Sequence, residues 1–218
     1  MLLNFKMLRN FVISSLLAIF LISCGQPDQE WISYGMDLSN QRFSRVTQIN
    51  KTNVETLEIV WQVETGVKAT FQATPIVHKG IMYVSLPFNN VIALDAKTGN
   101  EIWRYEHDLK PNWKLCCGPS NRGVALQGKQ LFFGTVDARL ISLNIKTGEK
   151  IWDINVVKNN VETESINDLD QSDANSDKQI SGGTGVGISM APVVYNGKVI
   201  IGITGVGYGL HVEEEGAN

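Results

Sequence analysis

The residues of this 218-residue chain whose types and spacing could do chemistry together are two adjacent cysteines, Cys116 and Cys117, with Arg122 close behind them. The third cysteine, Cys24, lies far away near the N-terminus. If the protein is exported, it folds in an oxidising compartment, and the number and position of its thiols become informative. The cysteine pair is therefore the first candidate for a functional site.

Other residues with catalytic or metal-binding potential lack a productive spacing. His78, His107 and His211 are isolated, without the spacing of a zinc site, so we expect them at surface or loop positions. The glycine-rich stretches 182–187 and 205–209 do not stand between a buried strand and a helix, as a nucleotide-binding fingerprint would. No Cys-x-x-Cys-His sequence occurs, so this stretch carries no covalent haem.

Charge and composition narrow the class of protein. The formal net charge is −3 and Lys and Arg form no cluster, which argues against a nucleic-acid binder that works through a basic surface. An insertion over about 156–187 is rich in Asp, Asn and Ser between Glu162 and Lys178. No fixed calcium-ligand spacing is visible there, so we interpret it as a solvated surface loop.

The N-terminus has the features of an export signal. Lys6 and Arg9 precede an apolar run, Phe11–Leu21, that is short for a permanent membrane span. Leu21–Gly25 resembles the cleavage box of bacterial lipoproteins, in which the cysteine becomes the first mature residue and carries the lipid. An ordinary signal peptide with an incidental cysteine, or an uncleaved anchor, remains open.

We therefore expect a lipoprotein signal peptide over 1–24, lipidation at Cys24, and a polar tether over 25–30. The folded part would cover 31–218. This organisation predicts a protein anchored by lipid at the periplasmic face of a bacterial membrane.

Internal repeats predict the fold. Val91–Trp103 and Leu140–Trp152 each contain an apolar strand, a tight turn with Lys-Thr-Gly, and a second strand with a tryptophan at its end. Glycine fits the positive-φ position of such a turn, and the Asp or Asn before it can bond the turn backbone. Trp61 marks the end of an earlier copy.

A second repeated element, strand–glycine turn–strand, occurs as Thr74–Val84, Gly123–Phe133 and Ala191–Ile201. Four short strands in roughly 40–50 residues is the period of a β-propeller blade. Unrelated hairpins of a β-sandwich would not explain why Trp and Gly recur in register. The sequence predicts an all-β chain of four-stranded blades, about three of them.

The opening of the folded part carries a family resemblance. Trp31–Asp37, Gln41–Ser44 and Gln48–Asn50 resemble the start of the mature pyrroloquinoline-quinone-dependent alcohol dehydrogenases, and the resemblance continues through the rest of the chain. It implies a propeller of eight blades locked by tryptophan-docking repeats, of which this chain supplies the N-terminal three or so. It also implies that pyrroloquinoline quinone (PQQ) lies in the central channel beside a Ca²⁺ or lanthanide ion.

Within the family, adjacent cysteines form a disulfide ring whose flat face packs on the quinone, which implies that role for Cys116 and Cys117. Closing so short a loop removes almost no unfolded-state entropy, so a rigid apolar plate is a better physical reason for it than global stability. The matching arginine, Arg122, would bond the quinone oxygens with fixed donors. Chance neighbours that stay reduced are the alternative.

The resemblance carries over to further cofactor-binding positions. Gln72 stands where a Glu usually bonds the cofactor, and Ser189 where a Thr or Ser hydroxyl does so, although both could be ordinary polar residues at strand starts. Thr204, Gly205 and Val206 match a turn that approaches a cofactor carboxylate.

One position departs from the family: Gly207 replaces a Glu that commonly ligates the metal. The family's catalytic aspartate lies further along its chain, so no catalytic residue is assigned here.

The function expected from the resemblance is oxidation of an alcohol or a sugar by the quinone, with electrons passed to cytochrome c or ubiquinone. The alternative is a non-enzymatic propeller lipoprotein, a scaffold of the outer-membrane barrel-assembly type. The cysteine pair followed by Arg122 favours the enzyme, since a scaffold does not need a surface that packs on a quinone.

Overall fold

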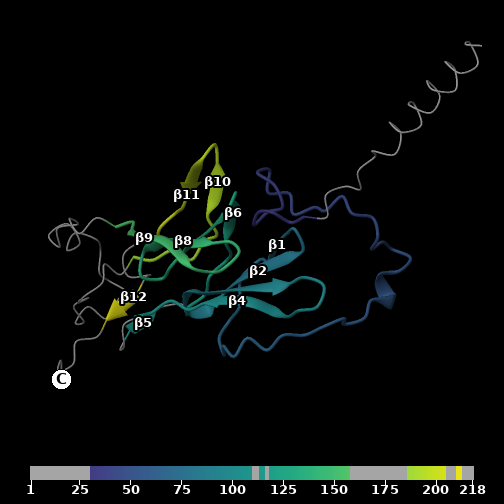
Figure 1. Cartoon of the computed structure of the whole chain (residues 1–218), viewed down its shortest axis with the longest axis horizontal. Coiled ribbons are helices and arrows are strands. Elements are labelled where there is room, and N and C mark those ends of the chain that lie inside the picture. The colour runs from purple at the N-terminus through teal and green to yellow at the C-terminus, as the bar shows by residue number, and fades with distance from the viewer. Residues whose placement is uncertain (1–29, 110–112, 116–117, 158–185, 205–209, 213–218) are drawn as a thin grey trace, which may run out of the picture. The chain divides into compact units, whose positions relative to one another are not determined.

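The structure is a computed structural model and describes residues 30–109, 113–115, 118–157, 186–204 and 210–212 (Figure 1). The predictions at Cys24, Cys116, Cys117 and 205–207 fall outside the described residues. The elements are η1 (Val54–Thr56), β1 (Ile76–His78), β2 (Ile81–Leu86), η2 (Pro87–Asn89), β3 (Asn90–Asp95), β4 (Glu101–Tyr105), β5 (Trp113–Leu115), β6 (Ala125–Gln127), β7 (Gln130–Gly134), β8 (Arg139–Asn144), β9 (Lys150–Asn155), β10 (Val193–Tyr195), β11 (Lys198–Ile200) and β12 (Leu210–Val212).

The strands form repeated antiparallel sheets. Strands β1-β2-β3-β4 form one four-stranded sheet and β6-β7-β8-β9 form a second, each in chain order (teal and green in Figure 1). Strands β10 and β11 form a hairpin that occupies the place of the first hairpin of a third unit, and β10 lies beside β6. The all-β repeat fold is therefore confirmed, with two complete blades and the first hairpin of a third in the described part.

Each complete sheet has the same turn between its last two strands. The carboxylate of Asp95 accepts hydrogen bonds from the backbone N–H groups of Lys97 and Thr98, at 3.0 and 2.8 Å. The amide oxygen of Asn144 accepts from the N–H of Lys146, at 2.9 Å. Both sheets also shift register at the equivalent pair, between Ala93 and Leu94 in one and between Ser142 and Leu143 in the other.

A tryptophan from the preceding repeat docks on each of these turns. The Nε1 atom of Trp61 donates to the carbonyl of Ala96 at 3.3 Å, and that of Trp103 donates to the carbonyl of Ile145 at 3.1 Å. A Cβ on Gly99 would lie 2.7 Å from the Trp61 ring, and one on Gly148 would lie 2.6 Å from the Trp103 ring. The predicted tryptophan-docking repeats thus need glycine for close approach as well as for positive φ.

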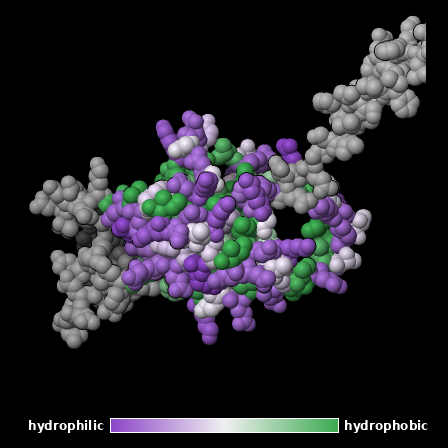
Figure 2. Space-filling view, in the orientation of Figure 1, coloured by the Kyte–Doolittle hydropathy of each residue, from purple (hydrophilic) through white to green (hydrophobic). Residues whose placement is uncertain are grey.

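The two sheets share one buried apolar cluster. Both contribute large side chains to it, each worth about 1.5–3 kcal/mol when fully buried. Its members are Ile76, Tyr83, Val91, Ala93, Trp103, Val124, Leu131, Phe133, Ile141, Leu143 and Ile145. Apolar side chains on the outer strands, such as Ile102 and Ile154, stay exposed, and Figure 2 shows hydrophobic residues interspersed with hydrophilic ones on the visible face.

By its internal contacts the chain divides into two units, and 44–57 belongs to a different unit from 30–43 and 58–218. Side chains of Asn50 and Asn53 fix the turns of this segment, where Asn53 Nδ2 donates to the carbonyl of Gln48 at 2.7 Å. Among the described residues, no helix is both long and apolar enough to cross a membrane.

Candidate functional site

Three segments, one from each repeat, meet directly before strands β1, β6 and β10. The backbone N–H of Thr74, ahead of β1, donates to the carbonyl of Arg122 at 3.1 Å. The N–H of Arg122, ahead of β6, donates to the carbonyl of Ser189, ahead of β10, at 2.9 Å. The repeat fold therefore brings together residues that are far apart in the sequence.

The side chain of Arg122 lies along this junction. Its Nη1 atom donates to Ser189 Oγ at 2.7 Å and is 3.5 Å from the Ser189 carbonyl oxygen. Both side chains are half-buried. Within the described residues the guanidinium hydrogen bonds all come from Nη1, so Nε and Nη2 keep N–H groups for a ligand.

The backbone packs closely at the same junction. Gly123 has φ +147°, and a Cβ there would lie 3.3 Å from the Cβ of Ala191 and 3.5 Å from the carbonyl oxygen of Thr74. A larger residue would be strained and would push the strand starts apart. Gln72, by contrast, is exposed, and the structure gives it no hydrogen bond within the described part.

Hydrogen bonds to Thr204 hold the segment that precedes Ser189. The hydroxyl of Thr204 accepts from the N–H of Gly187 at 2.8 Å, and the N–H of Thr204 donates back to the Gly187 carbonyl at 2.8 Å. The predicted cofactor contact of Thr204 stays a prediction, because in the structure its side chain supports the approach to Ser189.

The chain on either side of the cysteine pair is also held. Strand β5 ends at Leu115, which pairs with Leu210 of β12, and so links the approach to Cys116 with the residues after 209. On the other side, the carbonyl of Pro119 accepts from the N–H of Phe88 at 3.0 Å.

Sequence reasoning missed Asn121, which helps to position its neighbour Arg122. Asn121 is 2% exposed; its Nδ2 donates to the carbonyl of Gly134 at 2.8 Å and its Oδ1 accepts from the N–H of Gly123 at 2.9 Å. Its position directly before Arg122 is the one signal that the sequence offers.

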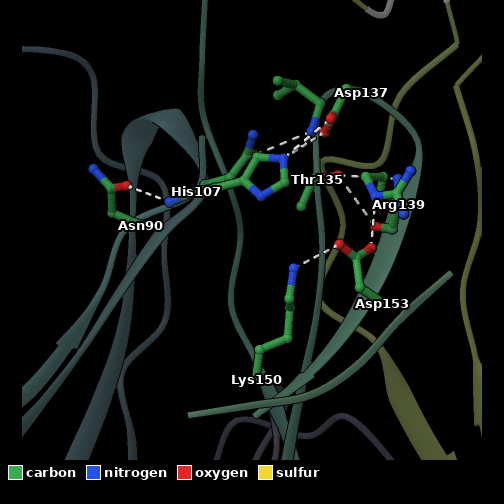
Figure 3. A network of polar contacts seen from close by, with 9 residues as sticks. Asn90, His107, Thr135, Asp137, Arg139, Lys150 and Asp153 are labelled. Carbon is green, nitrogen blue, oxygen red and sulfur yellow. Dashed lines mark hydrogen bonds and ion pairs between the residues drawn. The ribbon is translucent and has the colours of Figure 1, made fainter. Parts of the chain in front are cut away.

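His107 was expected at a surface or loop position. It lies in the loop after β4, as expected, and its side chain there is only 6% exposed. Its Nε2 lies 3.1 and 3.0 Å from the two carboxylate oxygens of Asp137 (Figure 3). Burial raises the pKa of Asp137, but hydrogen bonds from His107 and Thr135 outweigh this effect and hold the pKa below its ordinary value. Asp137 is therefore charged at neutral pH.

Metal ligands are not grouped in this region. Among the described residues, no three His, Cys, Asp or Glu side chains lie close enough together to hold a metal ion. Gly207, which replaces the Glu that commonly ligates the metal in the family, lies outside the described residues.

Comparison with known proteins identifies the family. The family model "PQQ: Glucose/ethanol/alcohol dehydrogenase, beta-propeller domain" matches residues 31–216. The chain belongs to this PQQ family. It is 37% identical over 187 residues to the quinohemoprotein alcohol dehydrogenase ADH IIB of Pseudomonas putida, covering 85% of this chain and 24% of that protein.

Solved structures agree with this assignment to the PQQ family. The quinohemoprotein alcohol dehydrogenase of Comamonas testosteroni matches with a TM-score of 0.67 and 34% identity, covering 86% of this chain and 25% of that one. A europium-containing methanol dehydrogenase matches with a TM-score of 0.66 and 26% identity, covering 83% and 28%. The chain thus spans about a quarter of the length of these relatives.

Proposed function

We propose that the chain forms part of the cofactor wall of a quinoprotein dehydrogenase, which oxidises an alcohol or a sugar and passes the electrons to cytochrome c or ubiquinone. The observation that carries the proposal is the placement of Arg122 beside Ser189, with N–H groups to spare, in a chain of the PQQ family. The names of the relatives, which are alcohol dehydrogenases, support the alcohol as substrate.

The residues at the junction suit a flat cofactor that is rich in oxygen atoms. When bound, PQQ supplies the acceptor for the two electrons of the oxidation. Arg122 would donate to its quinone oxygens, where negative charge grows on reduction, and Ser189 would fix the guanidinium and offer its hydroxyl. Gly123 lets the backbone approach, and Gln72 would add one amide from the segment before β1.

A binding experiment tests the proposal. PQQ added to the cofactor-free protein at its natural length should quench tryptophan fluorescence, and Arg122→Lys should raise the Kd by about 10–100-fold, the worth of a hydrogen bond to a charged group. Arg139→Lys is the matched control, because Arg139 pairs with Asp153 at 2.6 Å and not with the junction. No binding by the unchanged protein would overturn the proposal and favour the non-enzymatic scaffold.

A Ca²⁺ or lanthanide ion beside the quinone is part of the proposal, supported by the similarity to the europium-containing methanol dehydrogenase. Since the described residues contain no group of three possible ligands, the ion is assigned to none of them.

Export and the state of the cysteines can be tested together by mass spectrometry. We propose that Cys24 carries a lipid at the periplasmic face of a bacterial membrane and that Cys116 and Cys117 are bonded to each other. Protein extracted from membranes and alkylated without reductant should carry a lipid on Cys24 and no alkyl group on the other two cysteines. An alkylated Cys24 would refute the anchor, and two alkylated thiols would refute the cofactor-stacking role.

A further inference from the structure

The turn between β7 and β8, Thr135–Ala138, contacts the chain beside both residues of the proposed quinone site. The carbonyl of Thr135 accepts from the N–H of Ile188 at 2.8 Å, one residue before Ser189. Gly134, which leads into the turn, accepts from Nδ2 of Asn121 at 2.8 Å, one residue before Arg122. A displacement of this turn would therefore move both partners of the Arg122–Ser189 contact.

The turn is itself fastened to the other complete sheet. The N–H of Val136 donates to Oδ1 of Asn89 at 3.0 Å, and Asn89 is fully buried. The carboxylate of Asp137 pairs with Nε2 of His107, and the backbone N–H of His107 donates to Oδ1 of Asn90 at 3.2 Å (Figure 3). The two attachments come from the turn at the end of β2 and from the residues that follow β4.

We propose that His107 and Asp137 are positioning residues for the quinone site: their pairing holds the β7–β8 turn, and the turn holds Arg122 and Ser189 in register. The inference rests on the proposed function, because it gives the Arg122–Ser189 contact its role.

Burial makes the pair suited to this task. The His107 side chain is 6% exposed and that of Asp137 24%, so little water can replace a lost partner. Removal of Asp137 leaves Nε2 of the buried His107 without this partner, and removal of His107 leaves the carboxylate of Asp137 without the partner from the other sheet, although its hydrogen bond from Thr135 remains. The turn can relieve that cost by moving toward solvent. Ligand sites tolerate displacements of only about 0.5 Å, so the effect reaches the cofactor without a direct contact.

The test uses the protein at its natural length, prepared without cofactor. Asp137→Ala and His107→Ala should each raise the Kd for PQQ by about tenfold, the lower end of what the loss of an outer hydrogen-bond partner costs in metal sites. His107→Gln, which keeps an N–H near the position of Nε2, should restore most of the affinity. Asp153→Asn is the control, because it removes the charge that pairs with Arg139 and Lys150 and leaves the contacts of His107 and Asp137 unchanged.

Amide hydrogen exchange supplies a readout that needs no cofactor. Peptides with Arg122 and Ile188 should exchange faster in the two alanine variants, and should not do so in His107→Gln or Asp153→Asn. If the unchanged protein binds PQQ and the alanine variants bind equally well, the positioning role is wrong and the quinone site stands. If the unchanged protein does not bind PQQ, the proposed function fails. Unaltered exchange in the alanine variants would overturn the positioning role, whether or not the unchanged protein binds PQQ.

Discussion

The two complete sheets are alike at one end and different at the other. The turns after β3 and β8 share an Asx-bonded backbone, a glycine with φ of 75° or 73°, and a docked tryptophan. At the opposite end, the turn after β2 contains Phe88 and Asn89 at φ of 65° and 63°, whereas the turn after β7 carries Asp137 followed by Ala138 at φ of 60°. The first end repeats because its partner, a tryptophan, repeats. The second end differs because each turn contacts different chain segments around the proposed site.

The largest loss of stability is expected when a side chain is added between one of the repeated turns and its docked tryptophan. Gly148→Ala adds a Cβ at 2.6 Å from the Trp103 ring and at φ +73°. Positive φ costs about 1–2 kcal/mol and overpacking about 1–3 kcal/mol, so we expect a loss of about 2–5 kcal/mol in the free energy of unfolding. Urea titration of the protein at its natural length measures it.

Gly197→Ala is a matched control for this change. Gly197 has the same φ of +73°, but nothing lies within 4 Å of the Cβ position. The free energy of unfolding of the Gly197→Ala variant should fall only by the cost of positive φ, about 1–2 kcal/mol. Equal losses in the two variants would show that the tryptophan contact does not depend on the missing side chain.

The turns after β2 and β7, which differ between the sheets, can be compared through substitutions at one equivalent position in each sheet. Gly134 ends β7 and pairs with Leu140, as Ser85 of β2 pairs with Val91. A Cβ on Gly134 would overlap the side chain of Ile188, so Gly134→Ala should cost about 1–3 kcal/mol and weaken PQQ binding through Ser189.

Ser85→Ala provides the comparison. The hydroxyl of Ser85 is buried and has no hydrogen-bond partner in the described part of the chain, so its removal should be neutral or stabilising by about 1 kcal/mol. PQQ binding and urea titration report both effects. Similar losses in the two variants would contradict the idea that the end of β7, and not the equivalent position of β2, packs against the segment before Ser189.

This contrast also explains what could be predicted from the sequence. The turns with Gly99 and Gly148 were predictable because the Asp or Asn, the glycine and the preceding tryptophan form a local, repeated pattern. The site was not predictable from local pattern, because Arg122 and Ser189, or His107 and Asp137, meet only after distant strands have paired. The candidate cofactor residues came from family resemblance, which named Arg122 and Ser189 but gave no role to His107 or Asp137.

The smallest effect is expected where the same histidine–carboxylate chemistry is more exposed. Glu30 pairs with Nδ1 of His78 at 2.9 Å, and its other oxygen accepts from the N–H of Lys79 at 2.9 Å, but its side chain is 33% exposed. The backbone hydrogen bond from Lys79 has the largest effect on the pKa of Glu30; burial opposes it, His78 adds to it, and the pKa falls below its ordinary value of 4.5.

A carboxylate with a lowered pKa in the folded state stabilises the protein above its unfolded pKa, and this contribution is lost as the pH falls through the folded value. Glu30→Gln should therefore cost less than about 1 kcal/mol at pH 7, where solvent screens the pair, and the cost should shrink as the pH is lowered below 4.5. Urea titrations of both proteins at pH 7 and at acidic pH measure the difference, and added salt at pH 7 should reduce it. Since Gln keeps an oxygen that can accept from Lys79, a cost that stays constant with pH and salt would mean that the side chain's shape, and not its charge, secures this segment to β1.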